Sequence, residues 1–447
     1  MKTKKLGQRR NIWIRGWLVG ILLIMLMTTA CQGLPIEFEL PWQNTGMPVK
    51  KTATPAESDS TNTPGSNEPE VTPTAGGDPD TLIIWLPPEF NPNDESLAGH
   101  LLQEKLDSFA QENHIAITVR IKSRTGTGSL TDALTAASLA AATTLPDLIV
   151  LSATDLDIAT RRGLIFAHPR LEEMMSDTDW YPFGRELSKT NGQIRAIPLL
   201  SNPLSLVYNQ ASLLKPSDNW LDIKDNYGYF GFAADDSQAK FLLLLYLAAG
   251  GEVMDAQGRA ILEEEALIEA LTVLKEGQRT LHISNLSIGF QTEDQAWNAF
   301  LNRSVDTAVV PVGSVLNHQG ETVDQPKAAL TSPEITLASG MAWALANPSP
   351  NRQELALDLL EELVDTVFMA SWTEALGRLP ARPSALQAWT EAEMKPALEQ
   401  IAQATRLYPP EEVVNRLGPA LRNATLLILR DAADPIETAK TTIESIK

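Results

Sequence analysis

The run Thr81-Leu82-Ile83-Ile84-Trp85-Leu86 decides how the chain is read, because it is the first strongly apolar stretch after a long polar segment. A short continuous apolar run of this kind is typical of a strand buried on both faces, and Pro87-Pro88 ends it. The next segment, 96–112, carries leucines at helical spacing along one face, which predicts a helix. After it the sequence predicts a strand at 115–121, an alanine-rich helix from 129 to about 142, a buried strand at 147–151 and a helix from Asp155 that Gly163 stops.

Strands and helices alternate here with short joints, which favours right-handed crossovers and a mainly parallel sheet. The alternation restarts near 194, where two strands joined by a polar turn are predicted at 195–200 and 204–208. The expected fold class is therefore α/β, with enough chain for two or three domains. The remaining predicted elements are a weaker strand within 222–234, a strand at 305–310, and helices at 241–249, 263–278, 291–301, 353–367, 384–405, 411–430 and 435–446.

Cys31 is the only cysteine of the chain, and its surroundings make it informative. It follows a basic start, an apolar run over 16–27 and the small residues Thr28-Thr29-Ala30, which is the layout of a secretory signal with a cleavage site. A cysteine directly after such a site resembles a bacterial lipobox, in which the thiol is acylated. We therefore expect a lipoprotein signal peptide over 1–30 and a palmitate-type lipid on Cys31, which would hold the protein on the extracellular or periplasmic face of the cell membrane. An uncleaved anchor helix is the alternative, although Arg15 interrupts the apolar run and a span needs about 20 apolar residues.

Residues 31–79 are dominated by Thr, Pro, Ser, Asn, Gly and Glu. Such a stretch buries too little apolar surface to offset the entropy of ordering it. We expect a disordered tether between the lipidated cysteine and a globular body. The body should be large, since 43% of the whole chain is hydrophobic. The formal net charge of −20 disfavours nucleic acid as a partner.

Four stretches of the body together resemble the extracellular solute-binding proteins of ABC importers, in the group that includes the maltose-binding proteins. The likeness covers about residue 80 to the C-terminus, and the order and spacing of the stretches carry it. They are 145–151 (LPDLIVL) with a helix ending in RGLI, 197–209 (IPLLSNPLSLVYN), 296–309 (AWNAFLNRSVDTAV), and 339–345 (SGMAWAL) followed by a helix and 377–384 (GRLPARPS).

The resemblance implies a two-lobed periplasmic-binding-protein-like fold with a hinge, after the signal peptide and tether. It implies a first lobe from 80–197 and 337–382, and a second lobe from 198–336 and 383–447. A small-molecule solute, with a sugar or oligosaccharide as the expected class, would be captured between the lobes beyond the carboxyl ends of the strands. Closure of the hinge would present it to the permease subunits of the transporter. We expect a monomer that uses no cofactor and no metal.

Loops that follow strands supply the candidate ligand-binding residues, and each candidate has a structural alternative. Trp85 and Trp343 offer flat rings that could stack on a sugar, or they pack in the core. Glu89 follows the same first strand as Trp85, and a solvated surface position is its alternative. Ser152 and Thr154 follow the third strand, where the resemblance implies hydrogen bonds to ligand hydroxyls and capping of the next helix is the alternative. Asn202 lies in a turn of the binding segment that the resemblance points to, or merely precedes Pro203. The full set of candidates is Trp85, Glu89, Ser152, Thr154, Asn202, Asp236, Ser314, Gly340 and Trp343.

For Asp235, Asp236 and Arg378 a structural role is the commoner reading, although Asp236 stays among the candidates. Asp235 and Asp236 form a pair before an apolar helix, which is more often a cap than a ligand grip. Arg378, in the Gly-Arg-Leu-Pro turn, is expected to hold the turn rather than to contact ligand.

Patterns for enzymes are missing from the sequence. The five histidines show no metal-ligand spacing, and no G-x-S-x-G motif occurs. The favoured hypothesis is a lipid-anchored binding protein of an importer. A surface sensor or adaptor with the same fold is the second hypothesis, and a secreted glycan-active enzyme is the third.

Overall fold

The computed structural model describes residues 81–447 apart from 141–143, 212, 226–227, 281, 319–325 and 391–392. All described residues belong to one compact unit. The signal peptide (1–30), the lipidation at Cys31 and the tether (31–79) predicted from the sequence lie outside the described residues.

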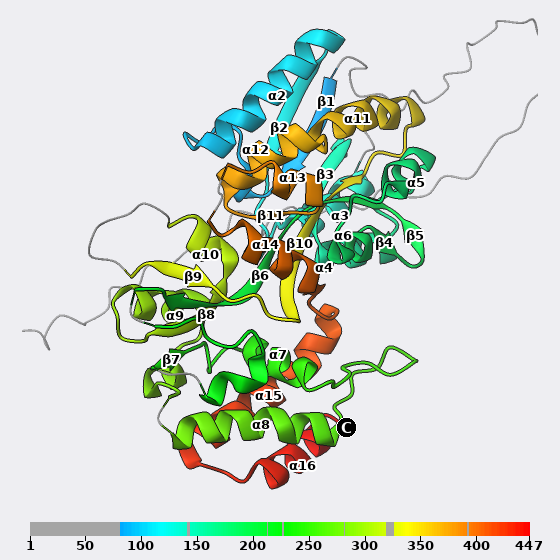
Figure 1. Ribbon diagram of the computed structural model, residues 1–447. Helices are drawn as coiled ribbons and strands as arrows, with labels where there is room; N and C mark the ends of the chain where they lie inside the picture. The colour runs from blue at the N-terminus through cyan, green and yellow to red at the C-terminus, as the bar shows by residue number, and fades with distance from the viewer. Residues whose placement is uncertain are drawn as a thin grey trace, which may run out of the picture. The chain divides into compact units, whose positions relative to one another are not determined.

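The unit contains helices packed around one main sheet (Figure 1). The strands are β1 (Thr81–Leu86), β2 (Ala116–Ile121), β3 (Leu148–Ser152), β4 (Lys189–Thr190), β5 (Gln193–Ile194), β6 (Ala196–Asn209), β7 (Phe230–Gly231), β8 (Thr307–Pro311), β9 (Ala328–Leu330), β10 (Thr336–Leu345), β11 (Leu379–Pro380) and β12 (Thr405–Leu407). The α-helices are α2 (Leu97–Asn113), α3 (Leu130–Ala140), α4 (Ala153–Arg161), α5 (Pro169–Ser176), α6 (Pro182–Leu187), α7 (Lys240–Ala248), α8 (Glu264–Arg279), α9 (Glu293–Leu301), α10 (Val312–Leu316), α11 (Pro350–Leu363), α12 (Thr366–Leu376), α13 (Pro383–Gln387), α14 (Lys395–Ala404), α15 (Glu411–Asp431) and α16 (Pro435–Ser445).

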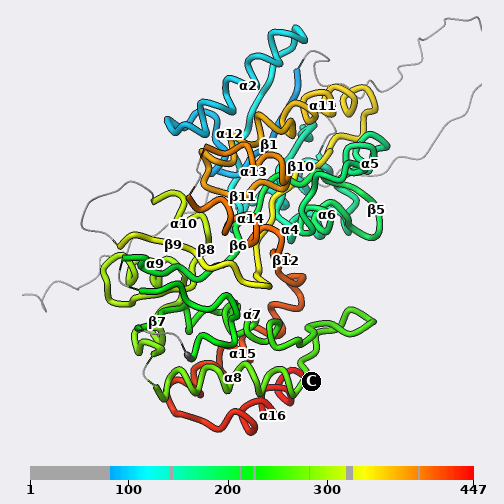
Figure 2. The backbone as a smooth tube through the Cα atoms, viewed as in Figure 1, coloured from blue at the N-terminus to red at the C-terminus, as the bar shows by residue number. Residues whose placement is uncertain are grey.

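The main sheet has the strand order β2-β1-β3-β10-β6-β8-β7. β1 pairs in parallel with β2 and β3, as predicted, and β7 is parallel to β8. The prediction of a mainly parallel sheet is wrong in the middle, where β10 is antiparallel to both β3 and β6, and β6 is antiparallel to β8. The reason is that β10 comes from a returning segment late in the chain, which enters the sheet from the opposite end (Figure 2).

β6 is a single strand of 14 residues, where the sequence predicts two strands and a turn. Its first half pairs with β10 up to Pro203, opposite Ala338, and its second half pairs with β8 from Leu204 onward. Pro203 therefore lies where one partner gives way to the next. A proline is tolerated at such a place because its missing N–H leaves no ladder bond broken. β6 and β10 are the strands that join the two lobes.

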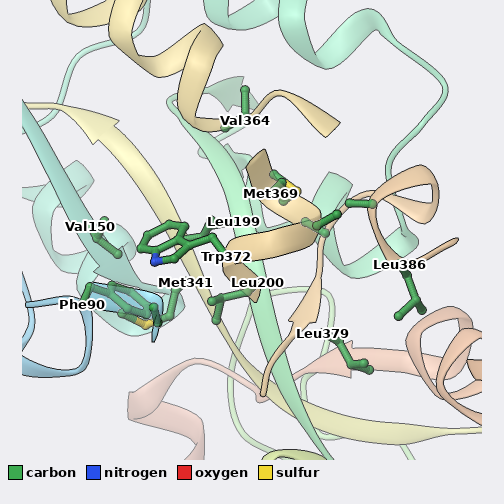
Figure 3. Packing of buried hydrophobic residues seen from close by; sticks show 14 of the residues in the cluster. Phe90, Val150, Leu199, Leu200, Met341, Val364, Met369, Trp372, Leu379 and Leu386 are labelled. Atoms are coloured by element: carbon green, nitrogen blue, oxygen red, sulfur yellow. The ribbon is translucent and has the colours of Figure 1, made fainter. Parts of the chain in front are cut away.

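The first lobe is built around β1, β2 and β3, and its strands alternate between two apolar layers. Leu82, Ile84 and Leu86 point into the layer beneath α2, α11 and α12, whereas Ile83 and Trp85 point into the layer with α3 and α4. This alternation follows from the two-residue period of a strand. Phe90, after β1, and Trp372, on α12, lie side by side in the first layer (Figure 3), with ring centroids 5.4 Å apart.

The second lobe is built around β7, β8 and the second half of β6, with α7, α8, α15 and α16 on one face (Figure 1). Leu206 and Val309 belong to the apolar cluster of that face. Val207, Ala308 and Val310 point the other way and join the cluster of the first lobe. The two lobes thus share a continuous apolar layer through the strands that connect them.

Three other predictions are corrected by the structure. The helix expected at 384–405 is two helices, α13 and α14. The weaker strand expected within 222–234 is a 3₁₀ helix, Trp220–Asp225, and the two residues of β7. The helix expected at 353–367 ends at Leu363, and α12 was not predicted. The carboxylate of Asp365 explains the break, because it accepts hydrogen bonds from the N–H groups of Val367 (2.9 Å) and Phe368 (3.3 Å) and so begins a new helix.

Candidate ligand-binding site

The carboxyl ends of β1, β2 and β3 bring polar side chains to one edge of the sheet. Since the three strands are parallel, the residues that follow them lie side by side. Glu89 follows β1 and Arg124 follows β2, and they form an ion pair with 3.1 Å between Oε1 and Nη1. Both side chains are exposed, so the pair contributes about 0–1 kcal/mol to stability. Breaking the Glu89–Arg124 pair to bind a ligand would therefore cost little free energy.

Ser152 and Asp155 occupy the same edge, at the end of β3 and the start of α4. The Ser152 hydroxyl accepts from the N–H of Asp155 (3.2 Å) and donates to its carboxylate (2.6 Å). Ser152, proposed from the sequence as a ligand contact, is thus the N-cap of α4. Burial raises the pKa of Asp155, while the Ser152 hydroxyl and the nearby charge of Arg124 partly oppose that rise. The hydroxyl of Thr154, half-buried in the first turn, makes no hydrogen bond to any described residue.

Asn202 lies at the midpoint of β6, opposite Ser339 of β10, and is therefore a strand residue and not the turn residue predicted. Its Oδ1 accepts a hydrogen bond of 2.9 Å from the N–H of Gly313. Gly313 and Ser314 lie in the first turn of α10, which follows β8 directly. The amide of Asn202 thus connects the strand between the lobes to the end of a second-lobe strand. Ser314 is half-buried, and its hydroxyl makes no hydrogen bond to a described residue.

Arg378 reaches this point from the other lobe, and it also holds its own turn, as expected from the sequence. It follows Gly377, which ends α12 in the left-handed conformation with φ 59°. Its Nη1 donates to the carbonyl of Gly377 (2.9 Å). The guanidinium lies so close to Gly313 that a Cβ there would stand 2.0 Å from Nη1. Its charge interacts with those of Glu89 and Arg124.

Trp85 and Trp343 are both core residues, which corrects their proposed role in stacking on a ligand. Trp85 is 2% exposed and Trp343 is 0% exposed. They lie on opposite faces of the sheet, Trp85 with Leu134 and Leu151 and Trp343 stacked on Trp372 at 6.4 Å. Each indole N–H is buried without a hydrogen-bond partner among the described residues. Two rings separated by a sheet cannot line one binding site.

Gly340 and Asp236 also have structural roles. A Cβ on Gly340 would meet the side chain of Leu187 at 2.9 Å, so this glycine is required by close packing. Asp236 is 6% exposed and accepts from the N–H groups of Gln238 and Lys240, both at 3.1 Å. It therefore caps the start of α7, the alternative weighed from the sequence.

Of the nine predicted residues, the structure places Glu89, Asn202 and Ser314 near the junction of the lobes, with Ser152 and Thr154 at the adjoining sheet edge. Sequence reasoning missed the positions of Arg124 and Arg378. The first could have been found from its place after a parallel strand.

The described residues contain no group of three or more acidic, histidine or cysteine side chains that could hold a metal. Within them, too, no helix is both long and apolar enough to cross a membrane.

Comparisons with known proteins agree with this architecture. One solved structure with the same fold is a cyclo/maltodextrin-binding protein complexed with maltotetraose, with a TM-score of 0.64 at 16% identity; the match covers 83% of this chain and 97% of that one. Another is the GacH receptor of Streptomyces glaucescens GLA.O, solved unliganded and with acarbose, with a TM-score of 0.58 at 17% identity; it covers 82% of this chain and 97% of that one. No curated protein is a significant sequence match.

The two solved structures establish the two-lobed binding-protein fold, and a family profile establishes membership. The profile of the bacterial extracellular solute-binding proteins matches residues 105–400, which is well over half of the chain. Proteins of this family bind solutes and are not enzymes, which removes the glycan-active enzyme from consideration. The chain belongs to the bacterial extracellular solute-binding protein family.

Proposed function

We propose that the protein captures a sugar or oligosaccharide between its two lobes and delivers it to the permease of an ABC importer. The observation that carries this proposal is a group of polar side chains near β6. Arg378 lies against Gly313, whose N–H binds Asn202, and its charge interacts with the Glu89–Arg124 pair. Carboxylate, guanidinium and amide groups are the donors and acceptors that sugar hydroxyls need. The similar folds bind maltotetraose and acarbose, both carbohydrates, which supports this class of ligand.

The proposed mechanism is noncovalent capture followed by hinge closure. The lobes consist of 80–197 with 337–382, and of 198–336 with 383–447. A ligand that contacts both lobes is bound more tightly when they are closed, so it shifts the population toward the closed form. The permease then recognises the closed monomer. The alternative, a sensor that binds the same solute without transport, differs only in this last step.

Lipidation belongs to the same proposal. The basic start, the apolar run and Cys31 support a lipoprotein signal, and the 31–79 tether would let the body reach a permease in the same membrane. Palmitate labelling of the full chain in a bacterial host should disappear in Cys31→Ala. Labelling of neither form would favour the uncleaved anchor.

The binding proposal is tested with the full-length protein in detergent. Thermal unfolding is followed with and without maltotetraose, acarbose and a panel of mono- and oligosaccharides. A ligand that binds only the folded protein stabilises it by about 2.7 kcal/mol at a hundred times its Kd, so a cognate sugar raises Tm. No rise with any sugar would contradict the proposal. Sugar uptake that depends on the gene separates importer from sensor.

A further inference from the structure

Arg378 is held rigidly where the two lobes meet. The turn that carries it docks on α10 through two close approaches, because Gly313 lies beneath the guanidinium and Gly377 lies beneath the side chain of Asn317. A Cβ would stand 2.0 Å from Nη1 of Arg378 in the first contact and 2.1 Å from Oδ1 of Asn317 in the second. Both glycines are therefore needed to seat the turn. A guanidinium fixed in this way loses little conformational freedom when it binds a ligand.

The hydrogen bonds of Arg378 use only part of its capacity. Nη1 donates to the carbonyls of Gly377 (2.9 Å) and Leu376 (3.5 Å), which belong to the end of α12. A guanidinium has five N–H donors. Among the described residues, no partner takes the N–H groups of Nε and Nη2. The contact with the end of α12 therefore uses Nη1 alone, and Nε and Nη2 remain able to donate hydrogen bonds to a ligand.

The charge of Arg378 is not balanced by a neighbour. Glu89, whose charge acts on Arg378, is ion-paired to Arg124, and no carboxylate of the described residues pairs with Arg378. Burial, and to a lesser extent the charge of Arg124, lower the pKa of Arg378, while Glu89 partly offsets them. An arginine nevertheless stays protonated in proteins. The result is a partly buried cation with unused donors in a chain whose formal net charge is −20.

We propose that Arg378 selects a solute that carries an anionic oxygen group, so that the preferred ligand is an acidic sugar and not a neutral one. A carboxylate or a phosphate accepts two parallel N–H bonds from the fork of a guanidinium. It would also supply the charge that a partly buried cation lacks. The inference rests on the proposed function, since it names the class of ligand for the same site.

Matched pairs of ligands test this proposal with the full-length protein in detergent. Glucose 6-phosphate is compared with glucose, and trigalacturonic acid with maltotetraose, by isothermal titration calorimetry. We expect one acidic probe to bind at least about tenfold more tightly than its neutral partner, which is the usual size of a charge-assisted hydrogen bond. The two pairs distinguish a phosphate from a carboxylate as the anionic group.

Variants show whether Arg378 causes the preference. In Arg378→Gln the acidic probe should lose at least about tenfold in affinity, while the neutral probe changes little. Arg378→Lys keeps the charge without the fork and should lie between the two. Gly313→Ala displaces the guanidinium without removing it and should also weaken the acidic probe. Arg259→Gln is the control, because it removes the same positive charge. Arg259 is exposed and paired with Asp255.

The outcomes separate the inference from the proposed function. Binding of maltotetraose or glucose with no gain for either acidic probe would overturn the role of Arg378 and leave sugar binding intact. Equal loss of neutral and acidic binding in Arg378→Gln would assign the residue a structural role and overturn the inference as well. Binding of none of the four probes or any sugar of the panel would contradict the proposed function, and the inference with it.

Discussion

Oδ1 of Asn202, at the midpoint of β6, lies 2.9 Å from the backbone nitrogen of Gly313 and accepts its hydrogen bond. This single bond ties the strand shared by the two lobes to the segment that follows β8. Since Gly313 is buried, its N–H has no ready substitute for the lost acceptor. A substitution at Asn202 therefore measures how much this bond contributes to stability.

Asn202→Ala should lower the free energy of unfolding by about 1–3 kcal/mol, because it leaves a buried N–H without a partner. Urea denaturation measures the change. Ser339→Ala is the matched control, since Ser339 faces Asn202 across the β6–β10 ladder and is exposed, and it should stay within about 0.5 kcal/mol. Equal effects of the two substitutions would contradict the assignment.

Trp343→Ala tests whether this tryptophan belongs to the core. The side chain is fully buried and stacks on Trp372, so its removal should cost about 3–5 kcal/mol of stability. The affinity of the folded fraction for a bound sugar should not change. Tyr229→Ala, at a ring that is 58% exposed, is the control with little effect on either. Lost affinity at unchanged stability would instead place the ring in the binding site.

Asp147→Ala should be among the most destabilising substitutions in the first lobe. The carboxylate accepts from the N–H of Ile83 (2.7 Å), from Asn347 (2.8 Å) and from Nε of Arg352 (2.7 Å), and so connects β1, β3 and α11. Breaking a buried ion pair costs about 3–5 kcal/mol, because the remaining charge is uncompensated. Chemical denaturation provides the measurement.

An exposed ion pair supplies the comparison for Asp147. Lys327 and Glu393 are joined at 2.9 Å with both side chains mostly exposed. Lys327→Ala should therefore change stability by no more than about 1 kcal/mol. A loss for Asp147→Ala as small as this would show that the buried network contributes little.

Asp155→Asn should change how stability depends on pH. Burial raises the pKa of Asp155 in the folded protein, so the unfolded chain ionises this group first. Stability from this residue is therefore present below about pH 4, where an unfolded aspartate is protonated, and is lost as the pH rises toward the folded pKa. The variant lacks this loss. Its stability relative to the wild type should rise between about pH 4 and pH 7, and a flat difference would refute the expected sign.

The local elements of the first lobe could be predicted from the sequence, because their signals are local. The apolar run of β1 and the leucine spacing of α2 need no distant partner to be recognised. β6 could not be predicted as one strand. Asn202-Pro203 is a turn signal by itself, and only pairing with β10 and β8, which come much later in the chain, holds the strand straight.

The candidate site was harder to predict than the fold, for the same reason. Trp85 and Trp343 are placed on opposite faces by the register of β1, β3 and β10, and register between strands is not visible in one sequence. Arg378 was assigned a local role because its turn is recognisable. Its neighbour Gly313 comes from another lobe and could not be inferred. The position of Glu89 at the sheet edge could be predicted because a loop after a parallel strand is recognisable from the sequence.

The position of β10 between β3 and β6 sets the order in which the protein can be assembled. The chain is made from the N-terminus, yet β3 and β6 have no partner on their facing sides until residue 345 has appeared. Until then the two strands present unpaired edges, which are the sites where chains aggregate. Neither lobe can therefore mature as an independent piece during synthesis. A truncation before β10 should yield an insoluble fragment and not a half-protein, and a holding chaperone would be needed longest for this part of the chain.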